Sequence, residues 1–264
     1  MDMISGTRPS ADRVVQWEGC YNARDLGGLP TLTGASTRYG RLIRSADTRF
    51  ITAAGWEAAR GAGIRVVIDL RNDDEVVPGL LPAATLGAGT FAVPAAPATA
   101  ARPADIQTML MPLDDIEDLG LWRRLNEEGL NGTPLYYRPF LDAKPGRIAA
   151  VLTAIARVPD GVIFHCGAGR DRTGLISLLL LCLAGVTPEA IAADYEFTLG
   201  KLASLYAALG LEQPEQDVRE YLKSRGTTVG ETIIGLVRDL DVAEYLAAAG
   251  VSGADIDALR RRLL

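Results

Sequence analysis

The amino-acid sequence predicts an α/β fold in which a mostly parallel central sheet is flanked by helices. Short apolar, β-branched runs alternate along the chain with longer segments whose apolar residues have helical spacing. Such alternation is typical of strands joined through helical crossovers. The chain has 264 residues, of which 48% are hydrophobic, and it can therefore bury a substantial core. We expect a single domain that spans residues 1–264.

Two strands and an intervening helix are expected in the N-terminal part of the chain. Residues 40–45 and 65–70 are the strand candidates. Residues 52–62 have helical spacing, and Thr52 is a suitable N-cap because its hydroxyl can accept a hydrogen bond from the first helical turn. Gly63 predicts the end of this helix just before the second strand.

A helix, a strand and a second helix follow in close succession in the central part of the chain. Residues 144–158 have the pattern of a helix that opens with Pro145. Residues 162–164 are a short β-prone run, and residues 175–183 are an apolar helix that would start near Thr173. A helix this short cannot span a bilayer, which needs about twenty residues, so we expect it to be buried at the centre of the fold.

The remaining regions have weaker patterns. Residues 78–105 are rich in Ala, Pro and Gly and predict an irregular surface excursion. Residues 106–142 mix apolar and acidic side chains and are a candidate cover for a pocket. Towards the C-terminus, helices are expected over residues 188–210, 214–224, 232–240 and 242–249. These helices either cover a site or complete the packing of the fold.

The strongest chemical signal lies in residues 162–174, where a strand leads through a glycine-punctuated loop into a helix. Backbone N–H groups converge in such a loop and the helix dipole adds partial positive charge, so the segment predicts an anion pocket. Cys166 opens the loop and should ionise easily there, while the fork of Arg172 suits two phosphate oxygens. The expected phosphate-binding residues are Gly167, Ala168, Gly169, Arg170, Asp171, Arg172 and Thr173.

The neighbours of the cysteine support this interpretation of the loop. Gly167 and Gly169 are expected to take unusual φ values that turn the loop amides inward. His165, the only histidine in the chain, is expected to brace the loop through a hydrogen bond between its ring and a backbone carbonyl. The plainer alternatives are a small buried cysteine, a structural histidine and a solvated basic turn at Arg170 and Arg172. A solvated turn would leave the two glycines and the adjoining strand unexplained.

The same segment resembles the signature of the cysteine-dependent protein tyrosine phosphatase superfamily, His-Cys-x5-Arg-Thr/Ser-Gly, and matches it fully from His165 to Gly174. Asp171, just before the signature arginine, is typical of the bacterial PtpB-like (tyrosine phosphatase B) branch. Three more segments resemble N-terminal signatures of that branch: residues 22–28, 40–46 and 67–71. The resemblance implies a protein tyrosine phosphatase-like fold, phosphatase activity and helices over the active site. Covering elements would then lie within residues 106–142 and 188–245.

The resemblance and the loop chemistry together imply a metal-independent phosphatase that needs no cofactor. The Cys166 thiolate would attack phosphorus and form a phosphocysteine, which water then hydrolyses. Backbone N–H groups from Gly167 to Arg172 and the Arg172 guanidinium would hold the three equatorial oxygens of the transition state. The Thr173 hydroxyl would donate to the sulfur when the sulfur becomes the leaving group.

The proton donor has three candidates. None of the tryptophans is followed by Pro-Asp, so the chain lacks the Trp-Pro-Asp loop that supplies the acid in many members of the superfamily. The resemblance favours Asp171, whereas Asp142, which precedes Cys166 by twenty-four residues, and Asp69 are alternatives. Asp69 and Arg71 could equally form a structural ion pair that supports the site from the end of a strand.

The substrate is expected to be a phosphorylated protein, with phosphotyrosine first and phosphoserine or phosphothreonine as further candidates. Arg170 adds a second positive charge beside the pocket, a feature that accompanies phosphoinositide hydrolysis in PtpB-like relatives, so a lipid phosphatase is the main alternative. A non-catalytic phosphate-binding module is a weaker alternative, because Cys166, Arg172 and Thr173 are all intact. A basic run would extend the site or form a solvated face: Arg38, Arg41, Arg44 and Arg49.

Charge and cysteine usage set the remaining expectations. The net charge of −6 argues against a nucleic-acid partner, which normally needs a basic face. Cys20, Cys166 and Cys182 are an odd number at unrelated spacings, which fits a reducing compartment and no disulfide framework. The first nineteen residues have no apolar core of a signal peptide, and the chain has no transmembrane segment, so we expect a cytoplasmic protein. The sequence does not predict the oligomeric state.

Overall fold

The computed structural model describes residues 11–76, 102–210 and 218–264. In this part of the chain, one five-stranded sheet has the order β1-β2-β5-β3-β4. Strands β2, β5, β3 and β4 are parallel to one another, and only β1 is antiparallel to its neighbour. The predicted fold class, a mostly parallel sheet flanked by helices, is therefore confirmed. The strands are β1 (Arg24–Asp25), β2 (Leu42–Ser45), β3 (Ile64–Asp69), β4 (Gln107–Leu110) and β5 (Gly161–His165).

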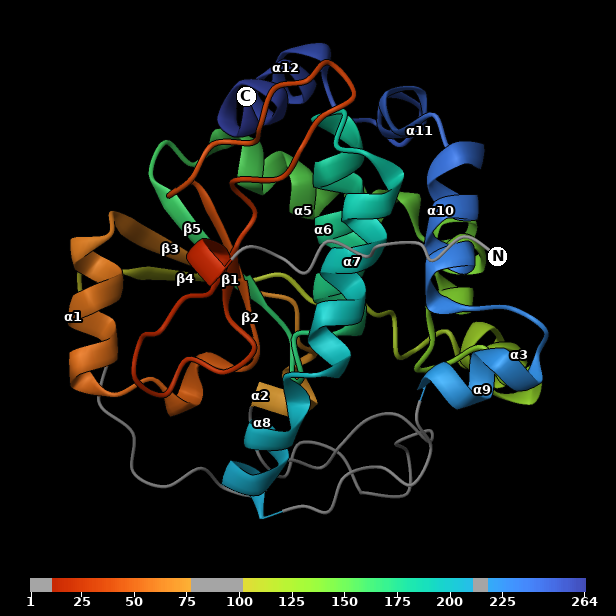
Figure 1. Cartoon of the computed structure of the whole chain (residues 1–264), viewed down its shortest axis with the longest axis horizontal. Coiled ribbons are helices and arrows are strands. Elements are labelled where there is room, and N and C mark those ends of the chain that lie inside the picture. Colours follow the sequence, from red (N-terminus) through yellow and green to blue (C-terminus); the bar gives the residue numbers. More distant parts are fainter. Residues whose placement is uncertain (1–10, 77–101, 211–217) are drawn as a thin grey trace.

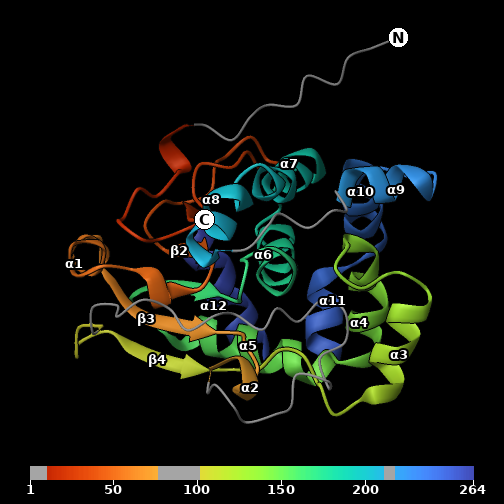
Figure 2. The same ribbon diagram turned by 90° about the horizontal axis from the view of Figure 1, so that it is seen from below.

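Helices cover both faces of the sheet (Figure 1). Figure 2 shows the same layers after a turn of 90°, with α1 well apart from α5, α6 and α12. Within the described ranges, three short 3₁₀ helices lie at Ala11–Arg13, Thr48–Phe50 and Pro134–Tyr136. The α-helices in chain order are α1 (Ala53–Gly61), α2 (Asp73–Val76), α3 (Leu119–Glu127), α4 (Tyr137–Ala143), α5 (Pro145–Arg157), α6 (Asp171–Leu183), α7 (Pro188–Leu199), α8 (Leu202–Leu209), α9 (Val218–Ser224), α10 (Val229–Asp239), α11 (Val242–Ala248) and α12 (Gly253–Leu263).

Strand β5 lies between β2 and β3 at the centre of the sheet, and side chains on both of its faces are buried. Val162 and Phe164 point into the larger apolar core, which α5, α6 and α12 complete. Ile163 points to the opposite face and packs in a smaller core with Trp56 of α1. A strand with helices on both faces needs apolar side chains at successive positions, which explains the unbroken run before the loop.

Helix α6 is buried along almost its whole length, as its apolar sequence predicts. It begins at Asp171, two residues earlier than expected, so its first turn is part of the loop that joins it to β5.

Thr52 caps α1 as predicted, by accepting a hydrogen bond from the backbone N–H of Gly55. No helix in the described ranges is both long enough and apolar enough to cross a membrane.

Several expected boundaries differ from the structure. The helix expected over residues 188–210 is two helices, α7 and α8, because the chain leaves the helical path at Gly200 and Lys201. Helix α10 begins at Val229 instead of residue 232, since the Thr228 hydroxyl accepts an N-cap hydrogen bond from the backbone N–H of Glu231. Residues 106–142 contain the edge strand β4 as well as α3 and α4, which pack into the core. Most of the excursion expected over residues 78–105 lies outside the described residues.

A candidate phosphate-binding active site

The candidate nucleophile lies at the carboxyl edge of the parallel sheet, where ligand sites of such sheets are found. Cys166 follows the last residue of β5 directly and is 3% exposed. Asp47 follows β2 and Asp69 ends β3, so the neighbouring strands deliver two carboxylates to the same edge. The loop then runs through Arg170 into the first turn of α6, as the sequence predicts.

Gly169 is required by the loop geometry. Its φ is +68°, and a Cβ atom at this position would lie 2.3 Å from the backbone oxygen of Ser45. No other residue type can occupy such a position without moving the backbone. The expectation for Gly167 is wrong, because its φ is not positive and a Cβ atom there would meet only a Glu75 oxygen at 3.8 Å, an ordinary contact.

Hydrogen bonds from three segments hold the loop by its carbonyl groups. Asn22 Nδ2 donates to the carbonyl oxygens of Ala168 at 3.0 Å and of Gly169 at 3.2 Å. Arg44 Nη2 donates to the Gly169 carbonyl at 2.9 Å, and the backbone N–H of Asp47 donates to the carbonyl of Gly167 at 2.9 Å. Because these carbonyls are bound on the protein side, the loop amides are left to face an anion.

A buried cluster of three arginines and one aspartate supports these contacts from behind the loop. Asp194 of α7 pairs with Arg13 at 2.7 Å, Arg24 at 2.9 Å and Arg44 at 2.5 Å, and all four side chains are almost completely buried. Burial alone would raise the pKa of Asp194, but the three guanidinium groups hold it well below its usual range. Burial and the neighbouring Arg44 lower the pKa of Arg24 to about 9, so Arg24 stays charged at neutral pH.

The signature arginine is held by two carboxylates that the sequence did not single out. Arg172 Nη2 donates to Glu75 Oε1 at 2.8 Å and Nη1 donates to Glu75 Oε2, so the pair is bidentate. Arg172 Nε lies 3.3 Å from Asp114 Oδ2. Burial would lower the pKa of Arg172, but Asp114 and Glu75 raise it well above its ordinary value. One signal could have identified both acids, since each follows a strand, β3 or β4, by a few residues.

Asp69, Arg71 and His165 form a linked group beside the cysteine. Arg71 Nη2 lies 2.6 Å from Asp69 Oδ2, and its Nη1 lies 2.6 Å from Asp47 Oδ2. His165 places Nδ1 3.0 Å from the carbonyl oxygen of Cys166 and Nε2 3.7 Å from Asp69 Oδ2. Burial raises the pKa of Asp69, but His165 and Arg71 outweigh it and lower the pKa to about 2. Asp69 is therefore ionised at neutral pH and poorly suited to donate a proton.

Asp171 and Asp142 have different surroundings. Asp171 lines the pocket, and its carboxylate accepts hydrogen bonds from Arg170 Nε at 3.0 and 3.1 Å. Asp142 at the end of α4 pairs with Arg138, and its side chain is 60% exposed and away from the pocket. Thr173 Oγ1 is buried and, in the described part of the chain, has no hydrogen-bond partner.

The basic run expected near the site does not form one surface. Arg44 is buried in the cluster around Asp194, and Arg49 pairs with Asp47. Arg38 and Arg41 are exposed, and the guanidinium of Arg38 contacts the backbone of Arg261 near the C-terminus. The run is divided because only Arg44 lies in β2, whereas Arg38 and Arg41 precede the strand and Arg49 lies in the 3₁₀ helix that follows it.

The pocket above the loop has a polar floor and an apolar wall. Cys166, Gly167, Arg170 and Arg172 line the floor, and Glu75 and Asp47 border it. The wall consists of Phe50 with Leu205, Tyr206 and Leu209 of α8. Helices α2 and α8 both lie towards the same end of the molecule, beyond the carboxyl edge of the sheet (Figure 1).

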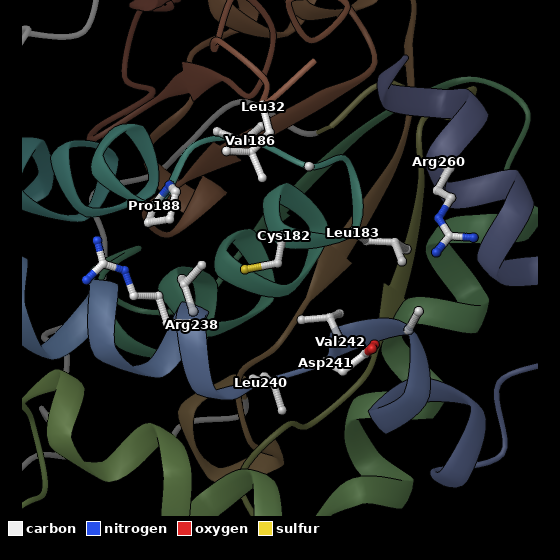
Figure 3. Close-up of a pocket in the computed structure, with 13 residues that line it drawn as sticks. Leu32, Cys182, Leu183, Val186, Pro188, Arg238, Leu240, Asp241, Val242 and Arg260 are labelled. Atoms are coloured by element: carbon white, nitrogen blue, oxygen red, sulfur yellow. The ribbon is translucent and has the colours of Figure 1, made fainter. Parts of the chain in front are cut away.

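A larger hollow of about 380 Å³ lies elsewhere, around the C-terminal end of α6. Figure 3 shows its lining, which includes Cys182, Leu240 and Arg238 but no residue of the Cys166 loop.

The other two cysteines differ from Cys166 in their position. Burial raises the pKa of Cys182 to about 12, and burial likewise raises the pKa of Cys20 to about 12, despite a hydrogen bond with Ser45. Both thiols stay protonated at neutral pH and are poor nucleophiles, which leaves Cys166 as the candidate.

A strand, a cysteine loop closed by arginine and a helix N-terminus, at the carboxyl edge of a parallel sheet, define the class of cysteine-dependent phosphatases. Comparison with known proteins supports this assignment. The model of the tyrosine phosphatase family matches residues 15–264, so the chain belongs to this family and is a phosphatase.

Curated relatives include proteins of three bacteria. The triple specificity protein phosphatase PtpB of Mycobacterium tuberculosis is 27% identical, over 93% of this chain and 97% of the relative. A tyrosine-protein phosphatase of Nostoc commune is 30% identical, over 84% and 73%. A Cupriavidus necator protein whose name places it among the tyrosine-protein phosphatases is 30% identical, over 75% and 71%. The solved structure of Pseudomonas aeruginosa TpbA aligns with 80% of this chain and 86% of its own at 14% identity, with a TM-score of 0.36 that is too low to support an argument.

Replacing Asp194 tests the buried cluster. Asp194→Asn leaves three buried guanidinium groups without their carboxylate, so we expect the free energy of unfolding to fall by about 3–5 kcal/mol. Urea denaturation followed by circular dichroism measures this change. Asp142→Asn is the control, since its exposed pair with Arg138 should contribute about 1 kcal/mol or less. Equal effects of the two substitutions would contradict the role given to Asp194.

Proposed function

We propose that this phosphatase hydrolyses phosphomonoesters without a metal, through a phosphocysteine intermediate, with phosphotyrosine as its first substrate. The observation that carries the proposal is the position of Cys166 and Arg172 at the two ends of one loop, at the N-terminus of a buried helix. Nucleophile and phosphate clamp thus share a single anion pocket.

The chemistry follows from these positions. The Cys166 thiolate attacks phosphorus in line and displaces the alcohol or phenol, and water then hydrolyses the phosphocysteine. The amides from Gly167 to Arg172, with the Arg172 guanidinium, stabilise the charge that spreads over the equatorial oxygens. In the second step Thr173 donates its otherwise unused hydroxyl hydrogen to the departing sulfur. His165 supports the loop through the carbonyl of Cys166.

Asp171 is the proposed proton donor to the leaving group. Of the three carboxylates considered from the sequence, it alone lines the pocket above the loop. Its partner Arg170 keeps the carboxylate turned towards the rim of the pocket. Asp69 and Arg71 are assigned a supporting role beside His165.

The wall of the pocket favours an aromatic leaving group. The lining residues Phe50, Leu205 and Tyr206 are apolar or aromatic, and contact with them would suit the ring of phosphotyrosine. Helix α8 supplies most of this wall, in keeping with a cover within residues 188–245. Phosphoserine and phosphothreonine are further candidate substrates, as the name of the Mycobacterium tuberculosis relative suggests. A phosphoinositide is the second candidate, because Arg170 adds a positive charge at the same pocket.

A substrate panel tests the choice among these substrates. Phosphotyrosine, phosphoserine and phosphothreonine peptides are compared with mono- and polyphosphorylated phosphoinositides by phosphate release. The highest kcat/KM is expected for phosphotyrosine. A preference for the phosphoinositides would favour the lipid phosphatase instead.

Loss of the nucleophile should abolish turnover and leave binding intact. Cys166→Ser should reduce hydrolysis of an aryl phosphate below a few per cent, because a serine hydroxyl at neutral pH is a far weaker nucleophile than a thiolate. Inorganic phosphate should still bind, as measured by calorimetry. Cys182→Ser is the control and should keep wild-type turnover. Substantial activity in the Cys166 variant would sink the mechanism.

The clamp requires arginine specifically. Arg172→Lys should lower kcat by about a hundredfold, on the order of 3 kcal/mol, because lysine cannot give a bidentate, delocalised contact. Steady-state kinetics with an aryl phosphate measures the loss. A kcat close to that of the wild type would show that the guanidinium does not hold the phosphoryl group in the transition state.

The proton donor can be identified from a leaving-group series. Asp171→Asn should slow phosphotyrosine, a poor leaving group, by roughly 10²–10⁴-fold and an activated aryl phosphate much less, because a low-pKa leaving group departs without a proton. The limb of the pH–rate profile that belongs to the donor should also disappear. An equal loss across the series would assign Asp171 a structural role.

A further inference from the structure

Arg172 has more negative than positive charge around it. Glu75 occupies both Nη atoms, and Asp114 Oδ2 lies 3.3 Å from Nε. The side chains of Glu75 and Asp114 are only 7% and 13% exposed, so water screens these charges weakly. Two carboxylates therefore share one guanidinium in a buried setting.

Asp114 is fixed in place by the end of the sheet. It follows β4, and the backbone N–H groups of Met111 and Leu113 donate to the carbonyls of Asp69 at 2.8 Å and Leu70 at 3.2 Å. These two bonds tie its segment to the end of β3, which also leads to Glu75. Asp114 thus approaches Arg172 on a rigid support.

The two carboxylates differ in how firmly they are held as anions. Burial would raise the pKa of Glu75, but the bidentate contact with Arg172 and the hydrogen bond from Asn72 N lower it. For Asp114, burial prevails over Arg172, and the nearby charges of Glu75 and Asp171 add to it, so that the pKa rises to about 6. The groups that face Asp114 are Arg172 and Asp171 of α6, Glu75 of α2, Arg147 of α5 and the phenol of Tyr136.

A phosphoryl dianion that binds Arg172 brings two more negative charges to this group. Negative charges that share one buried cation cannot all remain ionised at low cost, and the weakest-held carboxylate is the one that accepts a proton. We propose that Asp114 is a positioning residue for Arg172 that takes up a proton from solvent when the phosphoryl group binds. This inference rests on the proposed phosphate site.

The proton changes what Arg172 can do. A neutral Asp114 no longer competes for the guanidinium charge, while ionised Glu75 keeps the fork in its orientation. When phosphate leaves, Asp114 returns its proton to solvent. The proton thus cancels one of the two negative charges that the phosphoryl group brings to a group of side chains in which carboxylates already outnumber the guanidinium.

The test measures proton uptake with sulfate, which keeps two negative charges throughout the pH range used. It is carried out in the Cys166→Ser background, so that titration of the thiol does not contribute. Because the protonated form of Asp114 binds the dianion better, sulfate affinity should fall by roughly threefold or more from pH 5.5 to 7.5. Calorimetry in two buffers of different ionisation enthalpy should show uptake of roughly half a proton near neutral pH.

Matched variants separate the outcomes. In Cys166→Ser/Asp114→Asn the pH dependence and the proton uptake should be lost, whereas Cys166→Ser/Asp115→Asn, with the same change one residue along, should keep both. Unchanged proton uptake without Asp114 would overturn the inference. If the Asp114 variant does not fold, the carboxyl ¹³C shift of Asp114 in the single variant serves instead, and a titration that sulfate fails to move would also overturn it.

A separate measurement tests the underlying site. Sulfate should slow the alkylation of Cys166 by iodoacetamide in the wild-type protein. The degree of protection should also depend on Arg172. Absence of protection would contradict the phosphate site itself, whereas protection with unaltered proton uptake in the Asp114 variant would contradict only the role of Asp114.

Discussion

The phosphate loop depends on one buried carboxylate, that of Asp194. It joins Arg13, Arg24 and Arg44, which come from the N-terminal segment and the first two strands, to helix α7. Arg44 passes this constraint on to the loop, because its second Nη atom donates to the carbonyl of Gly169. Arg24 does the same indirectly, since it donates to Asn22 Oδ1 at 3.0 Å while Asn22 Nδ2 binds two loop carbonyls. The conformation of an anion pocket thus depends on residues far from it in sequence.

The cluster also sets the electrostatic pattern around the pocket. Behind the loop, three guanidinium groups meet a single carboxylate, and this excess positive charge lies where water cannot screen it. In front of the loop, Glu75 and Asp114 more than balance Arg172. The loop lies between the two charge groups, and the proposed anion site would therefore have positive charge behind it and a positioned guanidinium in front. This arrangement lets a protein with a net charge of −6 offer a local anion site.

The sequence was sufficient for the parts of the site that are contiguous, and insufficient for those that the fold assembles. Cys166 and Arg172 lie in one segment whose strand, loop and helix could be predicted together from local patterns. Glu75, Asp114 and Asp194 come from three separate segments. The position after a strand marks Glu75 and Asp114 as residues of the sheet edge, but it does not show which arginine they will meet, and Asp194 lies within a helix and has no such mark. Strand β4 was missed because it is a short edge strand with exposed side chains, which does not show the apolar pattern of a buried one. The break at Gly200 was missed because the apolar pattern continues on both sides of it.

The carboxylates at the edge of the sheet differ in their burial and in their partners. Asp69 is held ionised by Arg71 and His165, so it can orient its neighbours but not exchange protons near neutral pH. Asp171 is partly exposed, pairs with Arg170 and lines the pocket. Asp114 shares Arg172 with Glu75, which binds both Nη atoms, and burial raises the pKa of Asp114 to about 6. Burial and pairing thus give three carboxyl groups at one edge of a parallel sheet different surroundings, and the roles proposed for them in support, proton transfer and charge balance rest on these differences.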